Sequence, residues 1–186
     1  MKERQVKRGD EVITVAACFP TTIAPIVQYG AVPVFVDMEM THVNLDVTQL
    51  GKALTPKTTA IIPVHYGGQS CDMDEILAIA KKYNLFVLED AAHGVYTKYK
   101  DKIIGTIGDA TAFSFYATKN LTTGEGGMLT TNDDEIAEKA RVISLHGMSK
   151  NAWNRYSKAG SWFYEIKYPG FKYNMTDIQA SIGMHQ

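Results

Sequence analysis

LFVLEDAAHG, at residues 85–94, and TAFSFYATKNLTTGEGG, at residues 111–127, decide the fold. Each stretch begins with an apolar, strand-forming run and passes directly into residues that can do chemistry. Runs that are apolar throughout are typical of strands buried on both faces, as in parallel sheets. In such sheets, ligands bind beyond the carboxyl ends of the strands. The two stretches therefore predict a ligand site at the edge of a buried parallel sheet.

Outward from these stretches, short β-branched or apolar runs alternate with helical stretches. This alternation predicts an α/β fold with a mainly parallel sheet. Strands are expected at residues 12–15, 32–36, 59–64, 85–88, 111–115 and 128–131. Helices are expected at about 22–29, 46–54, 73–83, 133–146 and 177–186.

Four of the expected helices open with the spacing of a capping box. In this motif an N-cap side chain and a Glu or Gln three residues later satisfy free backbone amides at the start of a helix. The pairs are Asp46/Gln49, Asp72/Glu75, Asn132/Glu135 and Thr176/Gln179.

The composition bounds the classes of function. The chain has 186 residues, 45% of them hydrophobic and 21% charged, which suits one globular domain with a core. A net charge of −1 gives no electrostatic case for nucleic acid or an acidic membrane. No apolar run approaches membrane-spanning length. Cys18 and Cys71 lie far apart, so they form no metal-binding pair, and isolated thiols suit a reducing compartment such as the cytoplasm.

Asp90 follows the apolar run LFVLE. A carboxylate there is expensive to bury without a partner, and a positively charged partner would offset that cost. The alternative is an Asp that caps a following helix.

Lys119 lies just past the next apolar run and just before a glycine-rich turn. A lysine that forms a Schiff base needs a pocket in which its ammonium is disfavoured, so that the free amine is available. Ser114 and the turn glycines can present a hydroxyl and backbone amides to a phosphate. The alternative for Lys119 is an ordinary exposed loop lysine. An Asp at one strand end with Ser and Lys at the next favours the functional interpretation.

The remaining candidates are weaker. His65 follows the third expected strand near the same edge, where it contacts substrate or, as we slightly prefer, serves as a hydrogen-bonded structural histidine. His42 and His185 have no partner at a useful spacing, and no cluster with metal-ligand spacing is found. The aromatic-rich residues 153–173 stack on a sugar or nucleotide, or form a packed surface loop.

With these residues in view, the sequence resembles the DegT/DnrJ/EryC1/StrS family of pyridoxal-phosphate (PLP) sugar aminotransferases. The matching stretches are GDEVITVAACFPTTIAPIVQYGAVPVFVD, AIIPVHYGGQSCDMDEI, VLEDAAHGVYTKYKDKIIGTIGDATAFSFYATKNLTTGEGGMLTT and GFKYNMTDIQASIG. The resemblance implies the large domain of the aspartate aminotransferase fold (PLP fold type I), with helices on both faces of the sheet. It also implies the strand order second, first, third, fourth, fifth, sixth, with the sixth antiparallel. The short turn at residues 124–127 supports that last point independently, because a parallel crossover needs a longer connection.

The resemblance also implies roles. Lys119 would carry PLP covalently and transfer the proton, and Asp90 would pair with the pyridine nitrogen. His93 matches a position near the ring oxygen, and Ser114 would bind the phosphate. Phe19 matches an aromatic position that stacks on the ring, although an isolated Phe is more often a core residue.

Asn174 matches a residue that the family lends across a homodimer interface to the partner's phosphate. The alternative is a local turn or cap asparagine.

The family pattern extends beyond both ends of this sequence. Relatives carry a strand and helix with a Ser-Gly-Thr phosphate motif before the stretch at Gly9, and a small domain after the closing helix. We therefore expect residues 1–186 to form a single partial PLP-binding domain. By itself it should bind PLP weakly, because half of the phosphate grip would be absent. It should also self-associate, because the edge of the last strand would lie bare, and show no useful aminotransferase activity.

The expected activity is transfer of an amino group from an amino acid, with glutamate as the expected donor, to a keto group of a nucleotide-linked sugar. Relatives that are sugar dehydratases replace the lysine with histidine, so Lys119 argues against that reaction. Other enzymes of the fold type, such as desulfurases, are a distant option. An alternative from another class is an inactive fragment that folds or oligomerises without turnover.

Overall fold

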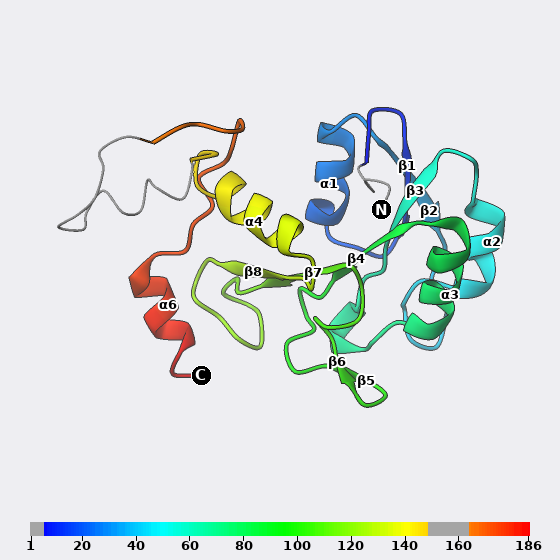
Figure 1. The fold of residues 1–186 in the computed structure, drawn as a ribbon. Helices are drawn as coiled ribbons and strands as arrows, with labels where there is room; N and C mark the ends of the chain where they lie inside the picture. The colour runs from blue at the N-terminus through cyan, green and yellow to red at the C-terminus, as the bar shows by residue number, and fades with distance from the viewer. Residues whose placement is uncertain (1–5, 149–163) are drawn as a thin grey trace.

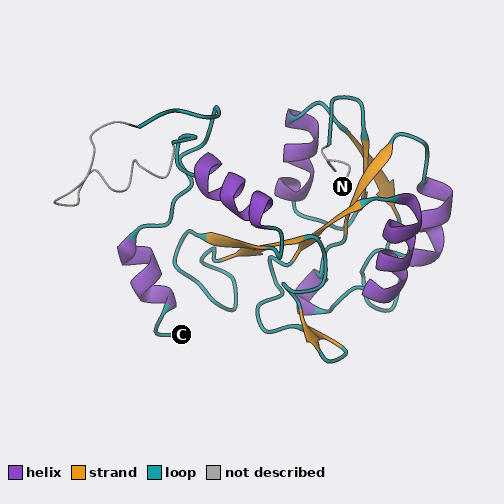
Figure 2. Cartoon of the chain, viewed as in Figure 1, coloured by secondary structure: helices purple, strands orange, loops and turns teal. Residues whose placement is uncertain are grey.

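The computed structural model describes residues 6–148 and 164–186, and it contains a six-stranded sheet in the order β2-β1-β3-β4-β7-β8 (Figures 1 and 2). Neighbouring strands are parallel except β7 and β8, which are antiparallel. The predicted order and the predicted antiparallel strand are both confirmed. The strands are β1 (Glu11–Val15), β2 (Val32–Val36), β3 (Thr58–Ile62), β4 (Phe86–Asp90), β7 (Ala110–Ser114) and β8 (Gly127–Thr130).

Helices cover both faces of the parallel part of the sheet, as predicted. Alternate residues of a strand point to opposite faces, so neighbouring side chains enter different cores. Ile13 packs in one cluster with α2 (Leu50–Ala53) and α3 (Met73–Tyr83). Val12 packs in the other cluster with Ile26 of α1 (Pro20–Gln28). Parallel strands with two buried faces explain why the sequence runs were apolar throughout.

The remaining helices lie on the side of β8. Helix α4 (Asp134–Ile143) contacts β8, and α6 (Asp177–Gly183) lies beyond it near the C-terminus (Figure 1). None of the helices in the described part of the chain has the length and apolar character that crossing a bilayer requires.

Several predicted boundaries were wrong by one to three residues. Helix α1 begins at Pro20, two residues early, because a proline suits the first helical turn, where its missing N–H is not needed. The helix expected at 46–54 is divided into the 3-10 helix η1 (Val47–Gln49) and α2. Helices α4 and α6 are shorter than expected. The strands differ from the expected ranges by at most two residues at either end, and β2 by none.

Of the four predicted capping boxes, only Thr176/Gln179 forms completely. Asp46 accepts from the Thr48 N–H, but the Gln49 side chain donates to the Asp46 carboxylate, and the Asp46 N–H donates to the Asp37 carbonyl instead. Asp72 is an N-cap without a side-chain cap bond. The cap of α4 is Asp133 rather than Asn132, and it accepts from two backbone amides of the first turn.

Small elements after β3 and β4 were missing from the prediction. They are the 3-10 helix η2 (Tyr66–Gly68) and a hairpin of β5 (Lys98–Tyr99) and β6 (Lys102–Ile103). Both adjoin the carboxyl edge of the sheet, and the Thr97 hydroxyl donates to the Gly68 carbonyl (2.8 Å). They are too short to show a hydrophobic period.

Candidate active site

A pocket of about 920 Å³ lies at the carboxyl ends of the parallel strands. Its wall is built from the residues that follow β1, β3, β4 and β7. Of the predicted site residues, those that line it are Phe19, Asp90, His93, Ser114 and Lys119. The topology therefore gathers on one pocket side chains that are up to 100 positions apart in the sequence.

Asp90 is the last residue of β4, and both oxygens of its carboxylate are held by neutral donors. The Thr22 hydroxyl on α1 donates to Oδ2 (2.6 Å), and the Ala92 N–H donates to Oδ1 (3.1 Å). Residues 91–97 form turns rather than a helix, so the alternative that Asp90 caps a following helix is wrong. Thr22 is buried and was missed by sequence reasoning, because nothing local to residue 22 indicates a bond to residue 90.

Lys119 and Ser114 frame the turn that follows β7. The Ser114 Oγ accepts from the Tyr116 N–H (3.3 Å), and the Lys119 N–H donates to the Tyr116 carbonyl (3.0 Å). Lys119 is half-buried and lines the pocket, so the alternative of a freely exposed loop lysine is wrong. Its positive charge is close enough to His93 to act on the pKa of that ring.

Phe19 and His93 lie on the rim of the pocket. Phe19 is 72% exposed as the N-cap of α1, so it is not the core residue that an isolated Phe usually is. The Gly67 N–H donates to Nδ1 of His93 (3.2 Å). Partial burial, together with the Lys119 charge, holds the pKa of His93 below its usual value against the opposing effect of Asp90. A neutral His93 ring therefore carries its hydrogen on Nε2.

Asn174 lies outside this pocket, between Lys172 and α6. Its Oδ1 accepts a hydrogen bond from the Lys172 ammonium. The predicted role of Asn174 toward a partner subunit stays a prediction. Trp153 and most of the aromatic-rich stretch lie outside the described residues.

Beneath the site, a buried pair joins Glu89 and His65. The exposed fractions of the two residues are 0% and 1%. Glu89 Oε2 bonds Nε2 of His65 (2.9 Å), and Oε1 accepts from the Gly108 N–H (2.7 Å) and the Thr111 hydroxyl (2.8 Å). Because the Cys71 N–H donates to Nδ1 of His65 (3.1 Å), the hydrogen of the neutral ring must be on Nε2, where it donates to Glu89.

The charge of the pair follows from these directions. Burial by itself raises the pKa of Glu89, but the bonds from His65, Gly108 and Thr111 outweigh it and hold that pKa below its usual value. Glu89 is thus a buried, ionised carboxylate, and each of its two oxygens accepts at least one hydrogen bond. The preferred interpretation of His65 as a hydrogen-bonded structural histidine agrees with this geometry, although the ring also reaches the pocket wall. The sequence signal for such a pair is an acid within an apolar run, LFVLED, which the sequence analysis applied to Asp90 and not to Glu89.

The other histidines and cysteines take no part in a metal cluster. His42 was expected to have no partner, but its Nδ1 bonds Oε2 of Glu39 (2.8 Å), three residues earlier in an exposed turn. Burial raises the pKa of Cys71 to about 12, which makes that thiol unreactive. In the described part of the chain no group of three or more His, Cys, Asp or Glu residues is arranged to hold a metal ion.

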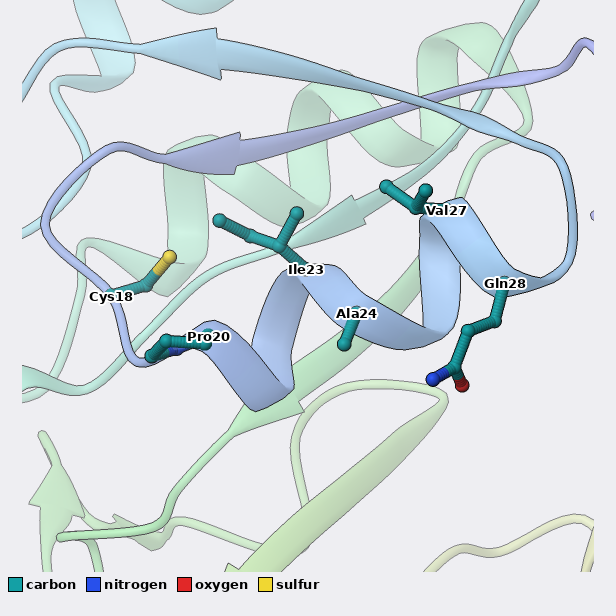
Figure 3. A pocket seen from close by; sticks show the side chains of 6 residues that line it. All are labelled: Cys18, Pro20, Ile23, Ala24, Val27 and Gln28. Atoms are coloured by element: carbon teal, nitrogen blue, oxygen red, sulfur yellow. The ribbon is translucent and has the colours of Figure 1, made fainter.

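A second hollow, of about 530 Å³, lies on the outer side of α1 (Figure 3). Pro20, Ile23, Ala24 and Val27 line it, spaced along the helix so that they share one stripe, with Cys18 and Gln28 at its ends. The lining holds a single ionisable group, the Cys18 thiol, and burial raises the pKa of that thiol. We therefore place the site in the larger pocket.

The chain belongs to the DegT/DnrJ/EryC1/StrS aminotransferase family, whose profile it matches over residues 1–186. Solved structures similar to this chain are described as aminotransferases, among them a sugar aminotransferase in a PLP form.

Two curated relatives and one solved structure are given as examples. The chain is 61% identical over its whole length to the spore coat polysaccharide biosynthesis protein SpsC of Bacillus subtilis, of which it covers 48%. It is 46% identical over 96% of its length to GDP-perosamine synthase of Caulobacter vibrioides, of which it covers 45%. A protein from Streptococcus pneumoniae assigned as a sugar aminotransferase, solved in its PLP form, superposes with a TM-score of 0.85 at 35% identity. That alignment covers 98% of this chain and 49% of the other. The chain thus spans about half the length of the relatives it matches.

Proposed function

We propose that this chain supplies the cofactor-binding half of an aminotransferase that uses PLP. The amino group would pass from an amino acid, with glutamate as the expected donor, to a keto group of a nucleotide-linked sugar. The observation that carries the proposal is the meeting of Asp90, Ser114 and Lys119 in one pocket whose rim holds an exposed Phe19. The similarity to GDP-perosamine synthase supports a nucleotide-linked sugar as the acceptor.

The pocket fits PLP in its chemistry. An aromatic aldehyde with a phosphate needs an amine, an acid near the ring nitrogen, phosphate donors and an apolar face. Lys119, Asp90, Ser114 and Phe19 supply these groups, and His93 would bind the ring oxygen. When bound, PLP supplies an electron sink for the carbanion that transamination requires.

The side chains of this protein then have separate tasks. Lys119 Nζ binds the cofactor covalently and, once released, carries a proton to or from the reacting carbon. Asp90, oriented by Thr22 and Ala92, holds the proton on the ring nitrogen. Ser114 and the amides of the glycine-rich turn bind the phosphate.

We also propose a homodimer in which Asn174 reaches the phosphate of the partner subunit. The free state of both described cysteines agrees with a cytoplasmic location. The alternative function, a folded chain that oligomerises without turnover, is favoured by one observation. Met128 and Leu129 of the edge strand β8 are largely exposed, which promotes association.

The test adds PLP to the purified chain and to a Lys119→Ala variant. We expect visible absorbance and a borohydride-stable mass increase on Lys119 in the first and neither in the second. In a full-length version, glutamate should then discharge the absorbance, and a keto sugar nucleotide should restore it. Equal labelling of both proteins would contradict the role of Lys119. Binding of PLP without any response to glutamate would favour the alternative.

A further inference from the structure

Lys119 lies in a connection, residues 115–126, that contains no helix or strand. A side chain in such a segment is not held by the repeating backbone hydrogen bonds of a helix or sheet, so its position depends on individual hydrogen bonds. One of these follows Lys119 directly: the Asn120 side chain donates to the Val95 carbonyl (3.1 Å). Others lie within the connection, such as the bond from the Thr123 N–H to the Phe115 carbonyl (2.9 Å). A third set comes from much further along the chain.

Helix α6 and the residues just after it hold the far side of this connection. The Thr122 N–H donates to Oε1 of Gln186 (3.1 Å), and Nε2 of Gln186 donates to the Thr122 carbonyl (2.5 Å). One amide side chain thus satisfies both backbone groups of Thr122, as a neighbouring strand would. Gln179 adds a bond from its Nε2 to the Glu125 carbonyl (3.0 Å).

The packing between these bonds is close. Gln179 and Gly183 are four residues apart on α6, which places them on one face of the helix, and Gln186 lies three residues past its end. A Cβ at Gly183 would lie 2.9 Å from Cγ2 of Thr123, so only a glycine permits this approach without a shift. The helix therefore lies directly against the connection that carries Lys119.

We propose that Gln179 and Gln186 are positioning residues for Lys119, acting through the backbone of Thr122 and Glu125. The inference rests on the proposed function of Lys119 as the covalent site. Covalent capture needs a near-attack geometry that small displacements disturb. Hence the amine depends on a helix that begins 58 positions after it in the sequence.

Gln179 offers a matched variant that separates positioning from helix capping. Its Oε1 accepts from the Thr176 N–H (2.9 Å) within the capping box, while its Nε2 reaches Glu125. Gln179→Glu retains the accepting oxygen and removes only the donor. Gln186→Glu likewise retains the acceptor for the Thr122 N–H and removes the donor to the Thr122 carbonyl, together with the bond that the same amide donates to the Ile182 carbonyl. Gln28→Glu, on the exposed side of α1, is the control for the added charge.

The first measurement is hydrogen exchange of the chain without cofactor, read by mass spectrometry. In both variants we expect the amides of residues 119–124 to exchange about tenfold faster. Each variant loses the hydrogen bond that the glutamine amide donates to a backbone carbonyl of the connection, and the new carboxylate repels that carbonyl. Amides of β3 and of α6 should exchange as in the wild type, as should all amides of Gln28→Glu. Unchanged exchange at residues 119–124 would overturn the proposal.

The second measurement is the rate at which Lys119 captures PLP, followed by visible absorbance and by borohydride fixation on the Lys119 peptide. We expect capture to be slowed about tenfold or more in both variants and unchanged in Gln28→Glu. Faster exchange with unchanged capture would show that the bonds stabilise the connection without positioning the amine, which also overturns the proposal. If the wild type captures no PLP at Lys119, the proposed function fails instead, and the exchange data still decide whether α6 holds the connection.

Discussion

Replacing Glu89 by glutamine tests the directions of the hydrogen bonds beneath the site. The carboxylate accepts from His65, Gly108 and Thr111 at 2.7–2.9 Å, and no water reaches it, because the residue is fully buried. Glutamine has nearly the same shape but offers one accepting oxygen and one donating amide group. Its oxygen can still serve Gly108 and Thr111, so its amide group must face His65.

The ring of His65 cannot adapt to that change. Its Nδ1 already accepts from the Cys71 N–H, so the hydrogen has to remain on Nε2, and two donors then face each other. The variant loses a charge-assisted bond, at about 1.5–3 kcal/mol, and leaves a buried donor unsatisfied, at about 1–3 kcal/mol. Together these terms lower the free energy of unfolding by about 2.5–6 kcal/mol, a range that contains the roughly 3–5 kcal/mol found when one member of a buried pair is removed.

Urea unfolding followed by circular dichroism measures this loss. Asp74→Asn is the matched control, because Asp74 forms an exposed ion pair with Lys100 and should change stability by about 0–1 kcal/mol. If Glu89→Gln destroys folding, the milder Thr111→Val, which removes one donor, should give a measurable loss of about 1–2 kcal/mol. A Glu89→Gln protein within about 1 kcal/mol of the wild type would refute the assigned directions.

The same carboxylate predicts how stability depends on pH. The pKa of Glu89 is lower in the folded state, so the unfolded state binds the proton more readily. Its contribution is therefore complete above the unfolded pKa of about 4.3 and is lost as pH falls through the lower folded value. The free energy of unfolding should therefore fall less steeply below about pH 4.3 in Glu89→Gln than in the wild type. An equal fall in both proteins would argue against an ionised Glu89.

Three further changes probe the pocket and the sheet edge. Thr22→Val removes the hydroxyl that donates to Asp90, which should weaken PLP binding about ten- to a hundredfold in an absorbance titration; equal affinity would count against the positioning of Asp90. Phe19→Ala should weaken PLP binding by about 0.5–1.5 kcal/mol while leaving the melting temperature unchanged, because the ring is exposed. Met128→Lys should reduce self-association in light scattering, since a charge on an exposed edge strand opposes pairing, and undiminished association would exclude the β8 edge as its cause.

The sequence predicted the sheet well, for local reasons. Strands buried on both faces are apolar at most positions, so their places are visible without knowing their neighbours. The antiparallel direction of β8 follows from the short turn before it, which cannot hold a parallel crossover. The strand order came from the family resemblance, because hydrophobic patterns do not state which strand lies beside which.

Helix starts were predicted less well, because the cap residue depends on where the incoming chain bends. Asp133 caps α4 although Asn132 has the right spacing to Glu135, and both are good cap residues by type. Thr176/Gln179 formed as predicted.

The sequence by itself determined the strands to within two residues at either end, and the presence of Asp90, Ser114 and Lys119 near their carboxyl ends. Only the tertiary structure decided what holds these groups: Thr22 lies 68 positions before Asp90, and Gln186 lies 64 positions after Thr122. The physical reason lies in the range of the two kinds of force. Burial of apolar surface depends on residue type averaged over a segment, so it is visible in a pattern. A hydrogen bond requires two particular atoms within about 3 Å and in line, and that meeting is set by the packing of whole elements.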